Sequence, residues 1–227
     1  MAASPPLSSA ELLARAERLA GESIARIASA LALPVPPDLK RHKGWVGHLV
    51  ERALGASAGS LPVPDFQTLG IELKTLPVDA HGYPYESTFV CTITIAELLG
   101  DEWSQSRVCH KLTRVLWMPL DGDRQRALSE RRFGSPFLWS PTPEQMEALK
   151  FDWEELTGRV ARYGVDAISG HIGQHLQIRP KAKNAAARRR GLDEDGGSAE
   201  NMPRGFYLRP SFTGSILRSH FGLPERS

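Results

Sequence analysis

One stretch organises what this sequence predicts: Pro64-Asp65-Phe66-Gln67-Thr68-Leu69-Gly70-Ile71-Glu72-Leu73-Lys74. Its apolar residues Leu69, Ile71 and Leu73 alternate with small or polar ones, which is typical of a β-strand with one buried face. The same alternation places Glu72 and Lys74 side by side on the other face. The stretch therefore predicts a strand that carries an acid and a base next to each other.

Asp65 precedes this predicted strand and can fold back toward Glu72 and Lys74. Two carboxylates and an ammonium group that converge at a strand form a site for a hard divalent cation and a polarised water. Carboxylate oxygens suit Mg²⁺, which keeps several waters and also binds substrate phosphates. The lysine can orient an attacking water and offset charge on a phosphate. The alternative is a half-exposed strand with a solvated glutamate and lysine, because short patterns of this kind also arise by chance.

Length and composition limit the class of protein. A chain of 227 residues allows one domain, or one domain with a lobe, and 41% hydrophobic with 24% charged residues is ordinary for a soluble globular protein. The net charge of +2 means that a surface for nucleic acid must come from local clusters. Cys91 and Cys109 are too few for a disulfide framework, which favours reduced thiols. No apolar run reaches transmembrane length and no signal peptide is recognisable, so we expect a cytoplasmic protein.

Apolar periodicity and capping signals predict the other elements. Helices are expected at about 8–21, 23–30, 44–54, 103–111, 142–160 and 211–221. Further strands, rich in β-branched and aromatic residues, are expected at about 86–95, 114–119, 176–178 and 206–208.

The helix expected at 44–54 carries a candidate third carboxylate. Gly44, Gly47 and Glu51 share one of its faces, next to the apolar face that joins the core. The two glycines would let another group approach the backbone where Glu51 projects. Glu51 is therefore either a plain surface acid or a third carboxylate of the site.

Two cationic clusters flank these acids in the sequence. Arg179-Pro180-Lys181 begins a basic stretch that runs to Arg190, and Lys40, Arg41 and Lys43 precede the helix with Glu51. A run of charge usually marks a solvated loop. Proline stiffens the first cluster, however, and this suits a segment that reaches into a groove. Cations on both sides of a carboxylate site are what a phosphodiester substrate would require.

Beyond these properties, the residues resemble a known family. Pro64-Asp65 followed by Glu72-Leu73-Lys74 is similar to the catalytic pattern of the PD-(D/E)xK nuclease superfamily. Within that superfamily, nearly the whole chain resembles the MutH family, the strand-nicking endonucleases of methyl-directed mismatch repair. The most specific matching segments are 43–47, 54–60, 70–75, 88–91, 110–112, 176–181 and 203–208.

The resemblance implies a restriction endonuclease-like α/β fold, with a mixed central sheet flanked by helices and two arms around a DNA cleft. On this basis we expect a single nuclease domain over 1–227. Its N-terminal arm, about 1–110, would carry the active site. Its C-terminal arm, about 111–227, would carry much of the DNA-reading surface.

The resemblance also implies roles for individual residues. Asp65, Glu72 and Lys74 match catalytic residues, and the first two match metal ligands. The residue that matches Glu51 supports metal or water binding, and the one that matches Lys111 lies beside the active site; both are counted with the catalytic set. The positions that belong to the DNA-facing set are Lys43, Glu86, Phe89, Arg179, Lys181 and Tyr207.

The implied activity is Mg²⁺-dependent nicking of the unmethylated strand at hemimethylated GATC sites in double-stranded DNA. A monomer would act, and MutL would activate it after MutS finds a mismatch. One alternative is a stand-alone restriction endonuclease that reads GATC, although such enzymes tend to carry a second domain or to dimerise. The other is a DNA-binding module without catalysis, against which an intact set of Asp65, Glu72 and Lys74 argues.

Overall fold

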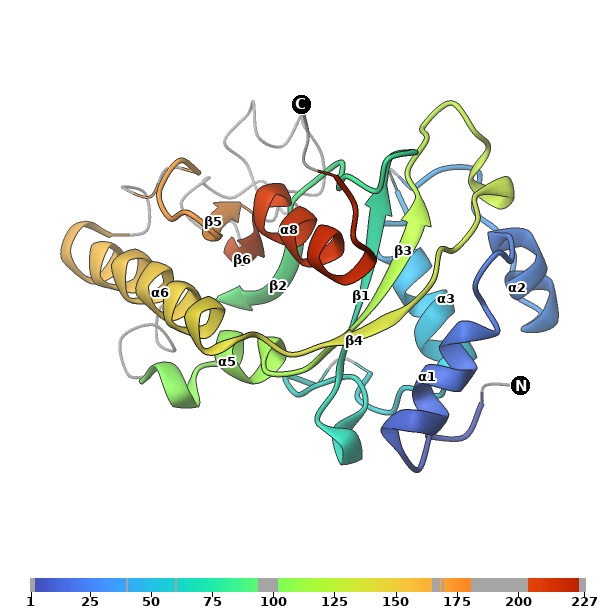
Figure 1. Ribbon diagram of the computed structural model, residues 1–227, viewed down its shortest axis with the longest axis horizontal. Helices are drawn as coiled ribbons and strands as arrows, with labels where there is room; N and C mark the ends of the chain where they lie inside the picture. The colour runs from blue at the N-terminus through green and yellow to red at the C-terminus, as the bar shows by residue number, and fades with distance from the viewer. Residues whose placement is uncertain are drawn as a thin grey trace. The chain divides into compact units, whose positions relative to one another are not determined.

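The computed structural model of the protein describes residues 3–39, 41–59, 61–93, 102–164, 168, 170–180 and 204–224. The chain forms two compact units, each assembled from separate stretches of sequence, and Figure 1 labels their elements. The first unit comprises Met1–Glu86, His110–Ser140 and Thr213–Ser227, and the second unit comprises Ser87–Cys109 and Pro141–Phe212. The expected division into arms at residue 110 stays a prediction.

The first unit contains a three-stranded mixed sheet. Strand β1 (Glu72–Val78) pairs in parallel with β3 (Val115–Asp121), and β3 pairs antiparallel with β4 (Phe137–Trp139). Six of the seven residues of β3 are buried, as expected for a central strand covered on both faces. In the parallel register, Glu72 lies opposite Val115 and Lys74 opposite Trp117. The first two residues of β1, Glu72 and Leu73, are buried.

Three helices bury their apolar faces in the core of the first unit: α1 (Ser9–Glu17), α2 (Ile24–Ala30) and α3 (Trp45–Leu54). Serine hydroxyls at positions 8 and 23 accept N–H groups of the first turns of α1 and α2, which satisfies donors that the helices cannot satisfy themselves. The shared core joins apolar residues of these helices to Leu116 and Met118, which alternate along β3. The helices and the sheet therefore pack against each other around one shared hydrophobic core.

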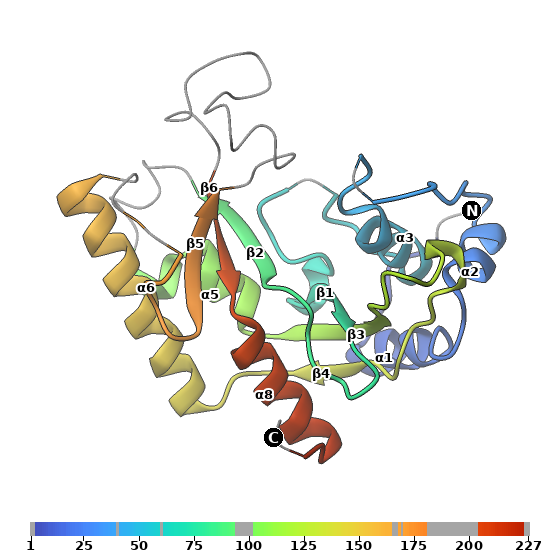
Figure 2. The same cartoon turned by 90° about the horizontal axis from the view of Figure 1, so that it is seen from above.

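The second unit contains an antiparallel sheet in the order β2-β6-β5, with β2 (Thr88–Ile93), β6 (Arg204–Leu208) and β5 (Leu176–Pro180) side by side in Figure 2. Helix α6 (Pro143–Tyr163) packs along β5. Thr142 and Gln145 form a reciprocal capping box at its start, with proline at the first position. The buried residues of α6 include Leu149, Trp153 and Leu156, which recur at helical spacing.

The turn before β5 is held by charges of both signs. The Asp152 carboxylate is 1% exposed and accepts the backbone N–H groups of residues 174–176 at 2.6 to 2.9 Å. The Arg209 guanidinium donates to three carbonyl groups between residues 170 and 173. Gly173 has a φ of +81°, and a Cβ there would collide with the carbonyl oxygen of Leu176. These contacts fix the residue at which β5 begins, and therefore its register.

The remaining described elements are α5 (Arg107–Leu112), α8 (Pro210–Phe221) and three short 3-10 turns, η1 (Gln67–Leu69), η2 (Trp103–Gln105) and η3 (Leu128–Glu130). None of the helices in the described part of the chain combines the length and apolar character needed to cross a membrane.

The α/β class with a mixed sheet is confirmed, and its strands form two sheets, one mixed and one antiparallel. The strand expected to include Leu69 and Ile71 begins later, at Glu72. The reason is local: Gln67–Leu69 form a 3-10 turn, Gly70 adopts a φ of +62°, and Phe66 and Ile71 pair across the turn. Strand β4 was not predicted, because three residues are too few to show a period.

Candidate active site

Asp65 lies just before the 3-10 turn that leads into β1. Its Oδ2 accepts the backbone N–H of Leu73 at 2.8 Å, which ties the carboxylate to the beginning of the strand. Its backbone carbonyl accepts the N–H groups of Ser57 and Ala58 at 3.0 and 3.3 Å. The 3-10 turn between them returns the chain, so an acid eight residues before Leu73 reaches the strand.

Glu72 is the centre of the cluster. Its side chain is 3% exposed, and its two oxygens are each shared with a different ammonium group. Oε1 lies 2.7 Å from Nζ of Lys74, and Oε2 lies 2.7 Å from Nζ of Lys111, which also donates to the carbonyl of Val63 at 3.1 Å. The half-exposed, solvated glutamate that the alternative interpretation required is therefore not what this structure contains. Lys74 and Lys111 hold one carboxylate in a fixed plane.

The pKa of Asp65 is raised to about 6, mainly because the carboxyl group is buried and also because the negative charge of Glu72 lies nearby. The N–H of Leu73 and the ammonium groups of Lys74 and Lys111 oppose this increase in the pKa without cancelling it. The negative charge of Glu72 thus disfavours ionisation of Asp65. A cation at this place would relieve that repulsion.

The residues present fit a hard divalent cation. Carboxylate oxygens are the ligands that Mg²⁺ prefers, and the partly buried Asp65 and the buried Glu72 supply them in one cluster. Within the described ranges, no three side chains of His, Cys, Asp or Glu gather in a way that could hold a metal. The protein would therefore supply two side-chain ligands, and water and substrate phosphate would complete the coordination, as Mg²⁺ commonly requires.

Glu51 lies on α3, partly exposed, with Oε2 3.7 Å from Nδ1 of His48. It does not join Asp65 and Glu72 in a group of three possible metal ligands. A Cβ at Gly47 would meet only the Glu51 carboxylate, at 3.9 Å, so the glycine face of α3 is open as the sequence indicated. A supporting role for Glu51 stays a prediction.

The residues expected to face DNA lie in both units. In the first, Lys43 is exposed just before α3, and Glu86 is exposed with its carboxylate 3.7 Å from the Arg124 guanidinium. Lys181 lies outside the described residues.

In the second unit, Phe89, Tyr207 and Arg179 share one face of the sheet. Phe89 pairs with Tyr207 across β2 and β6, and their rings meet edge to face at 5.3 Å. Gln177 pairs with Tyr207 across β5 and β6, and Arg179 follows two residues later on the same face. The guanidinium carbon of Arg179 lies 5.9 Å from the centre of the Tyr207 ring, within cation–π range.

Local patterns did not find every contact in these sites. Only the family resemblance indicated Lys111 as a site residue. It lies 39 positions after Glu72, and no helix or strand periodicity relates two residues at that separation. Ser87 and Gln177, whose side chains bond at 2.7 Å, gave no signal either. Both pairs become neighbours only through strand and helix packing.

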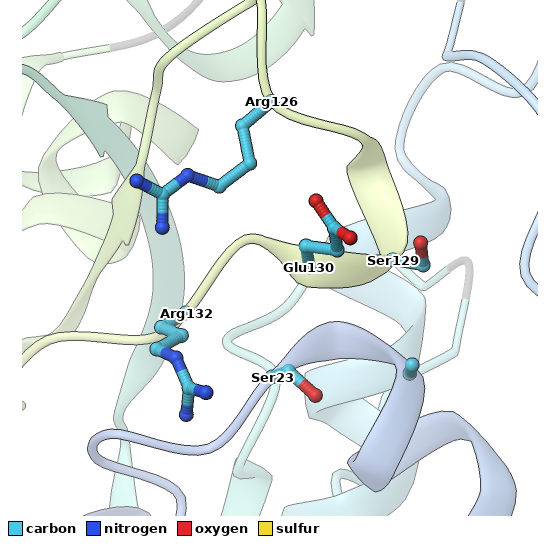
Figure 3. A pocket seen from close by; sticks show the side chains of 6 residues that line it. Ser23, Arg126, Ser129, Glu130 and Arg132 are labelled. Atoms are coloured by element: carbon cyan, nitrogen blue, oxygen red, sulfur yellow. The ribbon is translucent and has the colours of Figure 1, made fainter.

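A separate hollow of about 380 Å³ lies in the first unit (Figure 3). Its arginines already have partners: Arg126 lies 3.1 Å from the carboxylate of Asp121, and Arg132 donates to the carbonyl of Gly21 at 2.6 Å. No predicted site residue lines it; the lining consists of Ser23, Ala25, Arg126, Ser129, Glu130 and Arg132.

Two carboxylates and two lysines that meet at the start of a strand in a mixed α/β fold fit a metal-dependent nuclease. The comparisons with known proteins agree. The sequence model of the family described as "DNA mismatch repair enzyme MutH" matches residues 54–152. This segment contains Asp65, Glu72, Lys74 and Lys111.

Curated relatives match nearly the whole chain. It is 49% identical over 96% of its length to the DNA mismatch repair protein MutH of Shewanella baltica (strain OS185), covering 98% of that protein. It is 50% identical to the MutH of Serratia proteamaculans and 49% identical to that of Citrobacter koseri, over 96% of this chain and 95% of each relative. The chain belongs to the MutH family and is a DNA mismatch repair endonuclease.

The raised pKa of Asp65 predicts how metal binding depends on pH. Below a pH of about 6, a cation must displace a proton from Asp65, so its affinity should fall by up to about tenfold for each further pH unit. Above that pH the affinity should level off. Calorimetric titration of Mg²⁺ across this range, with Asp65→Asn as the control, measures it. An affinity that is flat down to pH 5, about one unit below the inflection, would contradict the prediction.

Proposed function

We propose that the protein nicks the unmethylated strand of hemimethylated GATC sites in double-stranded DNA with Mg²⁺ as cofactor. The observation that supports this most strongly is the cluster of Asp65, Glu72, Lys74 and Lys111 at the start of β1, with Glu72 buried at its centre. Such a cluster combines ligands for a hard cation with a lysine that can act on water. The GATC sequence, the methylation state and the identity of the metal rest on the family resemblance.

In the proposed mechanism, Asp65 and Glu72 would hold the metal ion. When bound, the ion would stabilise negative charge on the scissile phosphate and favour ionisation of a water. Lys74, 2.7 Å from Glu72, orients the attacking water and offsets charge on the phosphate. Lys111 holds the second oxygen of Glu72 and so fixes the orientation of that carboxylate. In-line attack of the water oxygen at phosphorus breaks the bond between phosphorus and the 3′-oxygen. The water loses a proton and the leaving 3′-oxygen gains one, which leaves a 5′-phosphate and a 3′-hydroxyl.

The DNA-facing residues have separate roles in this proposal. Arg179 donates to guanine in the recognition sequence, a contact for which the guanidinium group is well suited. Phe89 and Tyr207 contact the DNA with their paired rings. Glu86 belongs to the same set of DNA-facing residues. Lys43 and Lys181 contact the DNA as members of the same set, and Lys181 belongs to the same stiff Arg179-Pro180-Lys181 segment as Arg179. Glu51 supports the metal or its water.

The wider setting belongs to the same proposal. One nuclease domain, with an N-terminal arm of about 1–110 and a C-terminal arm of about 111–227, acts as a monomer in the cytoplasm. MutL activates it, and MutS acts indirectly by finding the mismatch. The family resemblance supports each of these points.

The proposal predicts which strand product forms first. The described part of the chain carries one such cluster, so supercoiled GATC plasmid incubated with Mg²⁺ and MutL should become open circle before linear DNA appears. Gel separation of the three plasmid forms over time measures this, and a plasmid without GATC is the control. Concerted conversion to linear DNA would instead favour a restriction endonuclease.

A further inference from the structure

Ser87 directly precedes β2, and its side chain contacts residues on the face of the second unit's sheet that carries Phe89, Tyr207 and Arg179. Its hydroxyl oxygen accepts the side-chain amide N–H of Gln177 at 2.7 Å. The same oxygen accepts a guanidinium N–H of Arg179 at 3.3 Å. A hydroxyl oxygen has two acceptor positions, so these two donors fill both.

Gln177 is itself held firmly. It is 5% exposed, is the second residue of β5, and lies in register with Tyr207. The start of its strand is fixed by the carboxylate of Asp152 and the guanidinium of Arg209 on the preceding turn. The amide of Gln177 is therefore a rigid donor that fixes where the Ser87 oxygen lies.

The Arg179 side chain needs such a fixed partner. Stacking over the Tyr207 ring restricts its height above the sheet, but a cation can slide across an aromatic face. Gly205, opposite Arg179, has no side chain to confine it, and a Cβ there would come within 2.8 Å of the Phe89 ring. A directional hydrogen bond to Ser87 supplies the orientation that stacking does not.

We propose that Ser87 is a specificity-determining positioning residue: its hydroxyl, set by Gln177, orients the Arg179 guanidinium for sequence readout. This inference rests on the proposed function, in which Arg179 contacts guanine. Bidentate recognition depends on the plane of the guanidinium, so a freely rotating Arg179 would still attract DNA but would discriminate less between sequences.

The test compares Ser87→Ala with Ser87→Thr, which keeps the hydroxyl. Binding to a hemimethylated GATC duplex and to a scrambled duplex is titrated in metal-free buffer at one ionic strength. For Ser87→Ala we expect the ratio of the two affinities to fall about tenfold, with scrambled-site affinity within about twofold of wild type. Ser87→Thr should keep the wild-type ratio. An unchanged ratio in Ser87→Ala, or an equal loss on both duplexes, would overturn the inference.

Arg179→Ala and the double variant separate this inference from the function on which it rests. If Arg179→Ala lowers the ratio and Ser87→Ala does not, only the inference fails. If Arg179→Ala leaves the ratio unchanged, the readout role of Arg179 fails and the inference fails with it. In the double variant, Ser87→Ala should add no further loss, because its effect acts through Arg179. Additive losses would show that Ser87 acts by another route.

Discussion

Replacing Asp65 with asparagine should lower the rate of DNA nicking by about a thousandfold or more, and should also stabilise the metal-free protein near neutral pH. Asparagine cannot supply the negative charge that the proposed metal ion needs. It also removes a carboxylate whose ionised form is disfavoured by burial and by Glu72, which together hold its pKa at about 6. Activity and stability should therefore change in opposite directions.

The stability gain has a defined pH window. Asp65 has a raised pKa in the folded protein, so the protonated form favours folding below its ordinary pKa of 3.8, and this contribution is lost as the pH rises through about 6. A difference of about two pH units corresponds to about 3 kcal/mol. Asp65→Asn should therefore be more stable than wild type by up to that amount above pH 6, and by little at about pH 4.

Urea unfolding of metal-free protein at both pH values, together with the plasmid assay, measures both effects. Asp123→Asn is a matched control, because Asp123 also accepts one backbone N–H, that of Gln125 at 2.9 Å, and lies away from the cluster. It should change neither nicking nor the difference in stability between the two pH values. Near-normal nicking by Asp65→Asn would exclude Asp65 as a metal ligand, and a loss of stability at the higher pH would contradict the electrostatic account.

Replacing Glu72 with alanine should abolish nicking and destabilise the protein by about 3 kcal/mol or more. Lys74 and Lys111 have side chains only 10% and 11% exposed, and both bond to the Glu72 carboxylate. Its removal takes away the carboxylate that both nearly buried ammonium groups contact, and leaves Asp65 to balance two positive charges. Removing one partner of a buried ion pair costs much more than removing an exposed one.

A double-mutant cycle tests this origin of the instability. Lys111→Met removes one of the two cations and keeps an apolar side chain of similar length. If the cost of Glu72→Ala comes from unpaired charge, Glu72→Ala/Lys111→Met should be more stable than Glu72→Ala alone. Glu17→Ala, an exposed glutamate on α1, is the control and should change stability by less than about 0.5 kcal/mol. Simple additivity of the two losses would rule out the shared-charge explanation.

The sequence alone determined the local elements and the class of chemistry. Capping signals at Ser8 and Thr142 and apolar periodicity located the helices to within a few residues, because these signals act between neighbours in the chain. The pattern of Asp65, Glu72 and Lys74 indicated a cation site for the same reason: one turn and one strand are enough to bring these residues together.

Only the tertiary structure decided how that site is buried and held. Alternation along a single strand could not tell that Glu72 would be covered, because burial depends on β3 pairing beside β1. Lys111 reaches Glu72 from a helix 39 residues later, and Ser87 meets Gln177 across 90 residues. Contacts at such separations leave no period in the sequence, since they are set by strand register and by packing that the whole chain must form at once.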